Sequence, residues 1–300
     1  NVQFGSKLNF RLNLHDNNLS NKFLVLLVAT WNVNSIRSRI DHVKEWLLTN
    51  KIDILCLQET KTEDKFFPIE VFSNLGYEVS ISGQKSYNGV AIISRLPINN
   101  IKIGFNEVIK DYKDLPILNE QKRIISAEIN DIRIINVYVP NGSSINSDKF
   151  IYKKKWLECL KFYLRKINLS KAPICLLGDF NIAPEDRDIH TPSNFKESIM
   201  ASSKERELLR DALGEELEDV FRIFEPGDKN WSWWDYRHSA WERDKGWRID
   251  HIYLTEDILS CANSCWIDKD PRSREKPSDH APVVVDISWP PSDVENEFFV

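Results

Sequence analysis

The chain has 300 residues, of which 42% are hydrophobic, and it carries a formal net charge of −5. This length and apolar content can fill a sizeable core, and layered α/β chains of this size commonly form one domain. The negative charge argues against a protein that coats nucleic acid non-specifically, because such binding needs a concentrated basic face. It does not exclude a nuclease, since a cleft can be locally positive on an acidic protein.

The chain is predicted to divide into three segments. Residues 1–22 are polar without a clear period, which is typical of an amino-terminal extension or loose arm. Residues 23–290 are expected to form a single domain, because no linker or repeat divides them, and residues 291–300 form a carboxy-terminal tail. The longest apolar run is too short to cross a membrane, and the odd number of five Cys favours a cytoplasmic location, beside the nucleoid if the source is bacterial.

Two apolar runs near the beginning are predicted as buried strands with polar ends. The first, residues 24–30, leads to Asn32, and the second, residues 53–58, stops at Glu59. A carboxylate at a strand exit suits a hard metal, because Mg²⁺ prefers one or two carboxylates and keeps most of its waters. Glu59 is therefore the metal candidate, and a surface ion pair with Lys61 is the alternative. Asn32 is either a turn former or a ligand for a phosphate or a metal-bound water.

Strand pairs joined by tight turns follow. Residues 124–130 and 132–138 are such a pair, and a similar pair surrounds residues 86–89, which indicates a mainly antiparallel sheet. The second strand of the later pair ends at Tyr138, where Pro and Gly stop it. Tyr138 and Asn141 then offer a hydroxyl and an amide at the same rim.

A lysine-rich amphipathic helix is predicted after this rim. Its large apolar residues, from Phe150 to Ile167, point inward. Its basic residues are expected to lie mostly outward, and they are Lys153, Lys154, Lys155, Lys161, Arg165 and Lys166. A solvated basic face explains these residues better than contact with phosphate.

The stretch from residue 172 to 181 combines an apolar run with an abrupt polar end. The run is predicted as a buried strand that delivers Asp179 and Asn181 to a site at its exit. On an extended backbone these two side chains point to the same side, so one can hold a water or metal and the other can position it. An ordinary exit from a strand into a turn is the alternative, because Asp and Asn favour turns.

Tryptophan is dense between residues 231 and 247, next to Arg237, Arg243 and Arg248. Tryptophan usually packs in a core, and some of these side chains must do so. The same density is typical of a wall on which a sugar or a base stacks. Both interpretations stay open for the group.

Polar residues also accompany the last two predicted strands. Asp250 lies on the strand 248–254, and Asp279 and His280 precede the apolar strand 281–287. An isolated Asp–His pair is more often a capped turn, but here it joins the polar groups at the earlier strand ends. Carboxylates, amides and a His without Cys suit Mg²⁺ or Mn²⁺, and their natural chemistry is phosphodiester hydrolysis. A serine hydrolase is less favoured, since no Ser lies in a nucleophile-elbow motif.

Eight short motifs occur in order between residues 25 and 289. They are WNVNSIR at 31–37, LQETK at 57–61, NGVAIISR at 88–95, YVPNG at 138–142, GDFNIAP at 178–184, WSWWDYR at 231–237, GWRIDHI at 246–252 and SDHAPV at 278–283. Together they resemble the exonuclease III branch of the endonuclease/exonuclease/phosphatase superfamily, which has a deoxyribonuclease I-like fold. The resemblance implies a four-layer α/β sandwich with two packed, mainly antiparallel β-sheets flanked by helices.

The resemblance also implies a role for each strand-end residue. For the metal site, it implies Mg²⁺, for which Mn²⁺ can substitute, with Glu59 as the main ligand and Asn32 and Asp279 near the metal or its waters. The implied catalytic residues are Tyr138 at the scissile phosphate, Asp179 and Asn181 at the attacking water, and His280, oriented by Asp250, at the phosphate in the transition state. The DNA contacts are Arg123, Asn141, and three residues that match the pocket for a flipped abasic sugar, Trp233, Trp247 and Ile249. Asn34 departs from relatives that carry an acidic residue there, which implies a weaker or single-metal site.

Members of this branch incise duplex DNA on the 5′ side of abasic sites, and many also remove 3′ nucleotides or blocking groups. The resemblance therefore implies a DNA repair phosphodiesterase that acts on double-stranded DNA with abasic sites or 3′ ends. The protein is expected to be a monomer that does not associate with a membrane. One alternative is a phosphatase of inositol phosphates or lipids in the same superfamily. Another is a binding module that keeps the fold without the chemistry.

Overall fold

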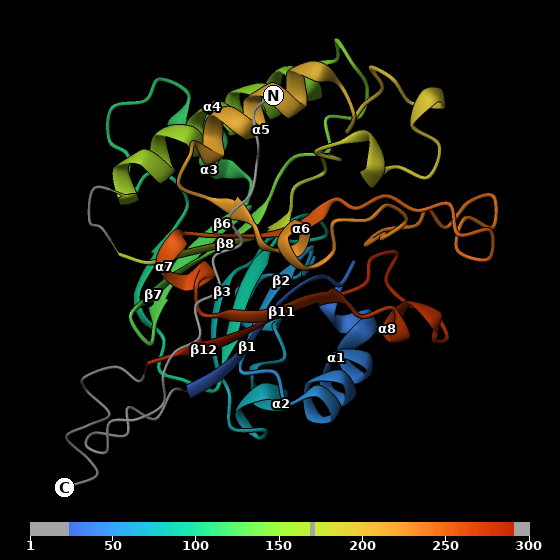
Figure 1. Ribbon diagram of the computed structural model, residues 1–300. Helices are drawn as coiled ribbons and strands as arrows, with labels where there is room; N and C mark the ends of the chain where they lie inside the picture. The colour runs from blue at the N-terminus through green and yellow to red at the C-terminus, as the bar shows by residue number, and fades with distance from the viewer. Residues whose placement is uncertain (1–23, 169–171, 291–300) are drawn as a thin grey trace, which may run out of the picture.

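Two six-stranded β-sheets pack face to face in the computed structural model, which describes residues 24–168 and 172–290 (Figure 1). The predicted extension at 1–22 and the predicted tail at 291–300 lie outside the described residues. None of the helices in the described part of the chain is long and apolar enough to span a lipid bilayer.

The first sheet has the strand order β11-β12-β1-β2-β4-β3. Its strands β1 and β2 run parallel, joined by helix α1 (Ile36–Asn50), and the other neighbours are antiparallel. The strand bounds are β1 (Leu24–Asn32), β2 (Ile54–Gln58), β3 (Glu78–Ser82), β4 (Val90–Ser94), β11 (Ala262–Ile267) and β12 (Val283–Trp289).

The second sheet has the order β5-β6-β7-β8-β10-β9. Here β7 and β8 are the parallel pair, joined by the long helix α4 (Asp148–Asn168), and all other neighbours are antiparallel. The strand bounds are β5 (Asn99–Ile103), β6 (Ile124–Ile129), β7 (Ile132–Tyr138), β8 (Ile174–Asp179), β9 (Glu218–Asp219) and β10 (Asp250–Leu254). The predicted tight turn between β6 and β7 is confirmed, because Asn130 and Asp131 both have positive φ, 48° and 63°.

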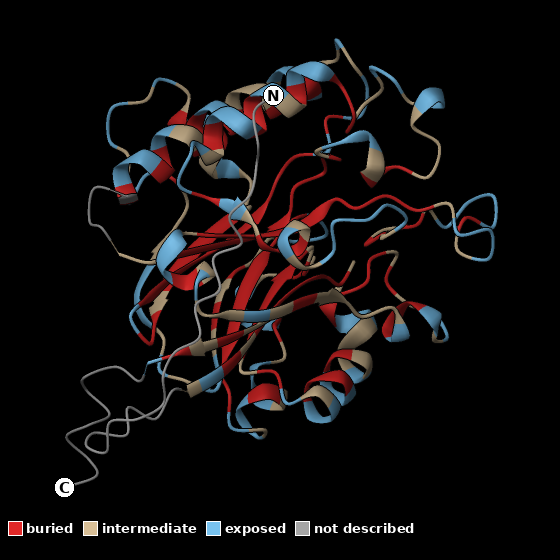
Figure 2. Cartoon of the chain, viewed as in Figure 1, coloured by how far each residue is buried: buried red, intermediate tan, exposed pale blue. Residues whose placement is uncertain are grey.

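Helices cover the outer face of each sheet. Helix α1 packs on the first sheet through an apolar cluster that includes Trp31, Val43 and Trp46, while α4 and α5 (Ser203–Leu213) lie side by side on the second. The shorter helices are α2 (Ile69–Ser73), α3 (Leu115–Glu120), α6 (Val220–Phe224), α7 (Glu256–Leu259) and α8 (Asp270–Ser273). The inner faces of both sheets form a third apolar cluster, and Figure 2 shows this buried interior between the helical layers. The predicted four-layer sandwich is confirmed.

The parallel strands place their carboxyl ends at one edge of the sandwich. In the first sheet Asn32 pairs with Gln58, and in the second Tyr138 pairs with Asp179. The close approach of β7 and β8 requires Gly178, because a Cβ there would lie 1.9 Å from the Val137 carbonyl oxygen. Polar residues that follow these strands therefore meet at a common edge.

The outward orientation expected for the basic residues of α4 is wrong for Lys153. Its side chain is completely buried, whereas Arg165 and Lys166 are exposed as predicted. Lys153 lies three residues after Phe150 and three before Trp156, so the helical period places it on the apolar stripe.

Candidate active site

Asp179 lies at the centre of the polar edge. Its side chain is buried, and its Oδ2 accepts hydrogen bonds from Asn32 Nδ2 at 2.8 Å and Asn181 Nδ2 at 3.1 Å. Its Oδ1 accepts the Asn181 backbone N–H at 2.9 Å. Asn181 has a φ of 50°, so the two side chains meet through a left-handed turn and not through the extended backbone that the sequence predicted.

Glu59 directly follows β2 and faces the same edge. Its Oε1 accepts a hydrogen bond from Asn32 Nδ2 at 3.0 Å, and its Oε2 lies 2.8 Å from Lys61 Nζ. The ion pair with Lys61 is therefore present, but the Glu59 side chain is only 19% exposed and belongs to the site. Burial raises the pKa of Glu59, yet Lys61 and the Asn32 amide outweigh burial and hold the pKa below its usual value. Glu59 is thus an ionised carboxylate.

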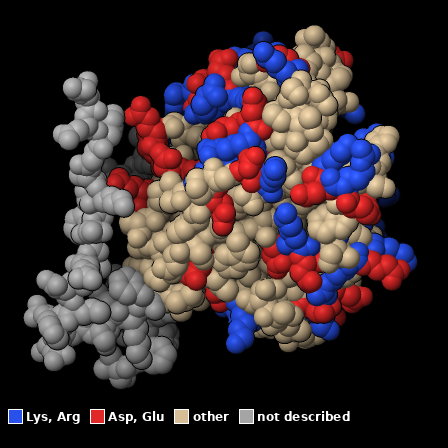
Figure 3. Space-filling model, turned by 45° about the vertical axis from the view of Figure 1, so that its right-hand side comes forward, with Lys and Arg blue, Asp and Glu red and all other residues tan. Residues whose placement is uncertain are grey.

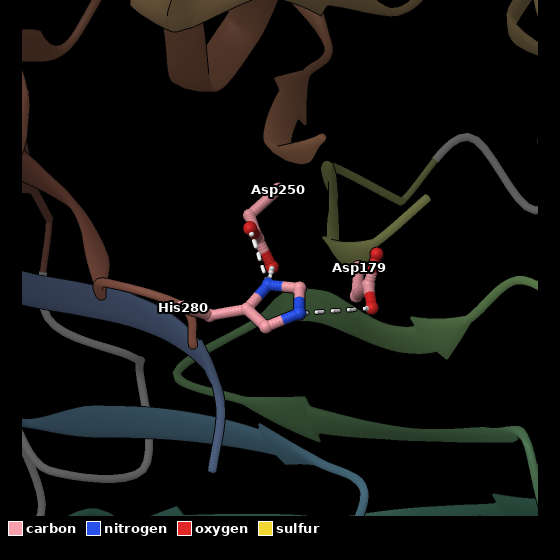
Figure 4. Close-up of side chains that lie close together, drawn as sticks. All are labelled: Asp179, Asp250 and His280. Atoms are coloured by element: carbon pink, nitrogen blue, oxygen red, sulfur yellow. Dashed lines mark hydrogen bonds and ion pairs between the residues drawn. The ribbon is translucent and has the colours of Figure 1, made fainter. Parts of the chain in front are cut away.

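His280 lies between two buried carboxylates (Figure 4). Its Nδ1 is 2.9 Å from Asp250 Oδ2, and its Nε2 is 3.9 Å from Asp179 Oδ2. Burial lowers the pKa of His280, but the charges of Asp250 and Asp179 outweigh that effect and raise it to about 10. Burial also raises the pKa of Asp179, which His280 partly offsets. The imidazolium of His280 and the Asp179 carboxylate therefore favour each other's charged form, while burial opposes both charges.

Asp279 is held by side chains of two other segments of the chain. Its Oδ1 accepts a hydrogen bond from Asn34 Nδ2 at 3.0 Å, and its Oδ2 accepts one from Trp233 Nε1 at 3.0 Å. Asn34 Oδ1 in turn accepts a hydrogen bond from Lys61 Nζ at 2.5 Å. Asp279 and Glu59 are therefore linked through Asn34 and Lys61.

Tyr138 and Arg123 form the rim beside Asp179. The Arg123 guanidinium lies 4.4 Å from the centre of the Tyr138 ring, and its Nη1 donates to the Tyr138 carbonyl oxygen at 3.2 Å. Burial, followed by the charge of Glu59, raises the pKa of Tyr138 well above its usual value, so the phenol stays protonated. Asn141 Nδ2 donates to Asn181 Oδ1 at 2.9 Å. Arg123, Tyr138 and Asn141 line one open groove of about 630 Å³ together with Tyr87, Lys149 and Tyr152.

Some tryptophans of the 231–247 group pack in the core, and others form a wall beside the site, so each of the two interpretations of the group applies to part of it. Trp231 and Trp234 are buried in a core cluster with Ala281, which is the structural role. Trp247 and Ile249 belong to a separate apolar cluster, and the partly buried Trp233 packs against it. The Trp233 ring centre lies 6.4 Å from that of Trp247 and 6.5 Å from the His280 ring, so these residues form an apolar wall beside the catalytic candidates.

Two serines that the sequence interpretation missed hold the site together. Ser232 Oγ donates to Asp250 Oδ2 at 2.6 Å and accepts the Asp250 backbone N–H at 3.0 Å. Ser278 Oγ donates to the Asn32 carbonyl oxygen at 2.6 Å and accepts the His280 backbone N–H at 3.2 Å. Both serines lie inside motifs that resemble the family, but neither has a sequence signature of its own.

The donor set fits a hard divalent cation. The carboxylates of Glu59 and Asp179 approach the same Asn32 amide nitrogen, to 3.0 and 2.8 Å, so their oxygens converge on one region. Oxygen ligands of this kind suit Mg²⁺ or Mn²⁺. Among the described residues, Asp179, Asp250 and His280 also lie close enough to hold an ion, with ligand atoms within 4.8 Å of one another. However, Asp250 already accepts a hydrogen bond from His280 Nδ1, whereas Glu59 keeps an ionised carboxylate at the same edge.

The two-sheet sandwich and its acidic edge define a hydrolase of phosphate esters. The chain belongs to the endonuclease/exonuclease/phosphatase family, whose model matches residues 29–280. This confirms the family that the motifs indicated.

Similar proteins cover nearly the whole described chain. Exodeoxyribonuclease III of Haemophilus influenzae is 34% identical over 268 residues, which are 85% of this chain and 97% of that protein. The structure of an AP endonuclease from Archaeoglobus fulgidus is 40% identical with a TM-score of 0.80, and covers 87% of this chain and 98% of its own. A 3′ phosphatase from Neisseria, bound to a product DNA hairpin, is 37% identical with a TM-score of 0.82, over 88% and 100% of the two chains.

Proposed function

We propose that this chain is a Mg²⁺-dependent DNA repair phosphodiesterase that incises duplex DNA 5′ to abasic sites. We include 3′-5′ exonuclease activity and the cleaning of blocked 3′ ends in the proposal. The observation that carries it is the convergence of Asp179, Asn181 and the His280–Asp250 pair beside an apolar wall, within this family. The similar proteins include an exodeoxyribonuclease, an AP endonuclease and a 3′ phosphatase, which supports all three activities.

In the proposed mechanism Asp179 accepts the proton of the attacking water. Its raised pKa makes it a better base than an ordinary carboxylate, since the most effective base titrates near the working pH. The Asn181 amide, bonded to the same carboxylate, orients the water. Because both groups are fixed by the turn after β8, little reorganisation is needed before attack.

In the same mechanism His280 and Tyr138 donate hydrogen bonds to the phosphate oxygens. Asp250 fixes the His280 ring through Nδ1, so the protonated Nε2 can donate to a phosphate oxygen as negative charge develops. Tyr138 adds a neutral hydroxyl donor at the adjoining rim. The direction of the His280 donor is set by Asp250 before substrate binds.

We assign the metal to Glu59, with Asn32 and Asp279 near it or its waters. Mg²⁺ is the proposed ion, and Mn²⁺ is expected to substitute for it. When bound, the cation supplies neutralising charge for the phosphate and the leaving oxygen. Lys61 and Asn34 hold the ligands in place, since Lys61 contacts Glu59 and Asn34 contacts Asp279.

The proposed partner is double-stranded DNA, bound by a monomer in the cytoplasm. Trp233, Trp247 and Ile249 would contact a flipped abasic sugar, because their apolar wall adjoins His280. Arg123 and Asn141 would contact the DNA backbone along their groove. On the face drawn in Figure 3, basic and acidic side chains are interspersed, so a broad basic surface does not cover this face.

A side-by-side nuclease assay tests this proposal. The substrates are an abasic duplex, a nick with a 3′ phosphate and a recessed 3′ end, each with Mg²⁺ and with chelator. Asp179→Ala and Glu59→Ala are expected to lower turnover by about 10²-fold or more. Asp211→Ala is the matched control, because that exposed carboxylate pairs with Lys161 on the helical surface. Full activity in chelator, or preferential hydrolysis of soluble inositol phosphates, would refute the proposal.

A further inference from the structure

Lys153 is a buried cation directly beneath the candidate site. Its side chain is 0% exposed, and its ammonium group has three hydrogen-bond partners. Nζ donates to the Asn181 carbonyl oxygen at 2.8 Å, to the Asn141 carbonyl oxygen at 3.1 Å and to Glu205 Oε1 at 2.5 Å. All three ammonium donors are therefore used.

Two of these partners belong to segments that carry candidate site residues. Asn141 follows β7 and Asn181 follows β8, so one ammonium group joins the exits of both parallel strands. The Asn141 and Asn181 side chains are also bonded to each other, and Asn181 continues to Asp179. Lys153 thus holds the backbone of Asn181, whose side chain contacts Asp179, and of Asn141, whose side chain contacts Asn181.

Glu205 balances the charge and is itself fixed. It lies in the first turn of α5, where its Oε2 accepts a hydrogen bond from Ser202 Oγ at 2.6 Å and, as part of a capping box, one from the Ser202 backbone N–H at 3.2 Å. Its Oε1 also accepts the Met200 backbone N–H at 3.1 Å. The end of α5 therefore anchors the ammonium group from the side opposite the strand exits.

We propose that Lys153, paired with Glu205, is a positioning residue that holds the Asn181 side chain against Asp179 and the Asn141 side chain against Asn181. This inference rests on the proposed function, because it assumes that Asn181 orients the attacking water. Lys153 does not touch the substrate in this arrangement. It acts by donating hydrogen bonds to the backbone carbonyl oxygens of Asn141 and Asn181, which fixes the two turns.

Stability alone gives no reason for an ion pair at this position. A buried pair loses the hydration of both charges, and well-packed apolar residues of similar volume often serve a fold equally well. An apolar pair, however, would donate nothing to the carbonyl groups of Asn141 and Asn181. The hydrogen bonds to the strand exits are therefore the feature that only the cation supplies.

Three variants separate the positioning role of Lys153 from the charge balance between Lys153 and Glu205. Lys153→Met removes the donors and leaves Glu205 unpaired, Glu205→Gln keeps the donors and removes the partner charge, and the double variant removes both charges. The unfolding midpoint is expected to fall in each single variant and to recover in the double variant. In contrast, kcat should fall about 10- to 100-fold in both variants that lack Lys153, with KM changed by about twofold or less.

Arg133→Met is the matched control. Arg133 is also buried, and it donates to the Asn100 carbonyl oxygen and to Glu128 near the start of β7, away from the strand exits. Its loss is expected to lower the unfolding midpoint and to leave kcat unchanged. A double variant that recovers both the midpoint and the wild-type kcat would overturn the inference.

A readout that needs no substrate separates this inference from the proposed function. The side-chain amide resonances of Asn181, assigned through Asn181→Asp, should move in Lys153→Met and in the double variant but stay in place in Arg133→Met. An inactive wild-type enzyme on all DNA substrates would refute the proposed function, while these resonances would still report on the positions of the amides. Unmoved Asn181 resonances in the folded double variant would overturn the inference.

Discussion

Asn32 Nδ2 lies 2.8 Å from Asp179 Oδ2, although the two residues end strands of different sheets and are 147 residues apart in the chain. The same nitrogen donates to Glu59 Oε1 at 3.0 Å. One amide therefore separates two carboxylates that would repel each other across the junction of the sheets. The Asn32 amide therefore couples the proposed metal ligand, Glu59, to the proposed base, Asp179.

Asn32→Ala is expected to weaken both the fold and the site. Without the amide, Glu59 and Asp179 lose a shared donor, and the free energy of unfolding should fall by about 1–3 kcal/mol. Mg²⁺ should restore part of this loss, because a cation compensates the two carboxylates. Urea unfolding with chelator and with Mg²⁺ measures both effects. Equal stability of the variant and the wild type in chelator would contradict the expectation.

Glu59→Gln tests the assignment of the metal. A ligand that binds only the native state stabilises it, by about 1.4 kcal/mol at ten times its dissociation constant. Wild-type protein should therefore show a rise in melting temperature on titration with Mg²⁺, and Glu59→Gln should lose most of it. His280→Gln should keep the rise, since His280 is not among the assigned ligands. The opposite pattern would move the metal to the cluster of Asp179, Asp250 and His280.

Strand ends were the part of the site that the sequence could predict. Buried strands appear as apolar runs, and the polar residue that follows each run is visible without tertiary information, as for Asn32, Glu59, Tyr138 and Asp179. Their convergence could not come from the runs alone, because it depends on which strands are parallel and on how the sheets pack. The family resemblance supplied that step.

Residues that support the site were harder to predict. Ser232 and Ser278 act through hydrogen bonds to backbone and carboxylate groups that only the folded chain brings near. The burial of Lys153 could have been predicted, because the helical period places this residue on the apolar face of α4. The many lysines of the helix favoured the prediction of an outward orientation instead. Trp231 and Trp233 are two residues apart, but Trp231 packs in the core cluster with Trp234 while Trp233 packs against Trp247 and Ile249, which only the folded chain decides.

Protonation of His280 between Asp250 and Asp179 is expected to make the free energy of unfolding depend on pH. The pKa of His280 is raised to about 10 in the folded chain, above an unfolded value of about 6.5. Its protonation therefore stabilises the native state fully below about pH 6.5, and this contribution is lost as the pH rises towards 10.

The free energy of unfolding of wild type minus that of His280→Gln should accordingly decrease between about pH 7 and pH 10, with a slope of at most about 1.4 kcal/mol per pH unit. Urea titrations at several pH values measure the difference, and subtraction removes groups that titrate alike in both proteins. Parallel curves for the two proteins would show that His280 is neutral in the fold.

Trp233 combines two roles that substitutions can separate. Its ring faces Trp247 and His280, and its Nε1–H donates to Asp279. Trp233→Ala removes both, and its kcat/KM on abasic duplex should fall about 10- to 100-fold, since a stacked group contributes about 1–3 kcal/mol. The loss on a recessed 3′ end should be smaller if the wall contacts the flipped sugar. Trp233→Phe keeps a ring but loses the donor, so it should mainly raise the Mg²⁺ concentration needed for half-maximal rate.

Trp241→Phe is the control for these two variants, because Trp241 packs on Trp234 in the core cluster and not on the wall. It should affect the melting temperature more than kcat/KM. Equal losses of Trp233→Ala on both DNA substrates would mean that the wall serves general packing of the site. In that case the preference for abasic DNA would have to come from the groove beside Tyr138 and Arg123, which the same assay can examine with Arg123→Ala.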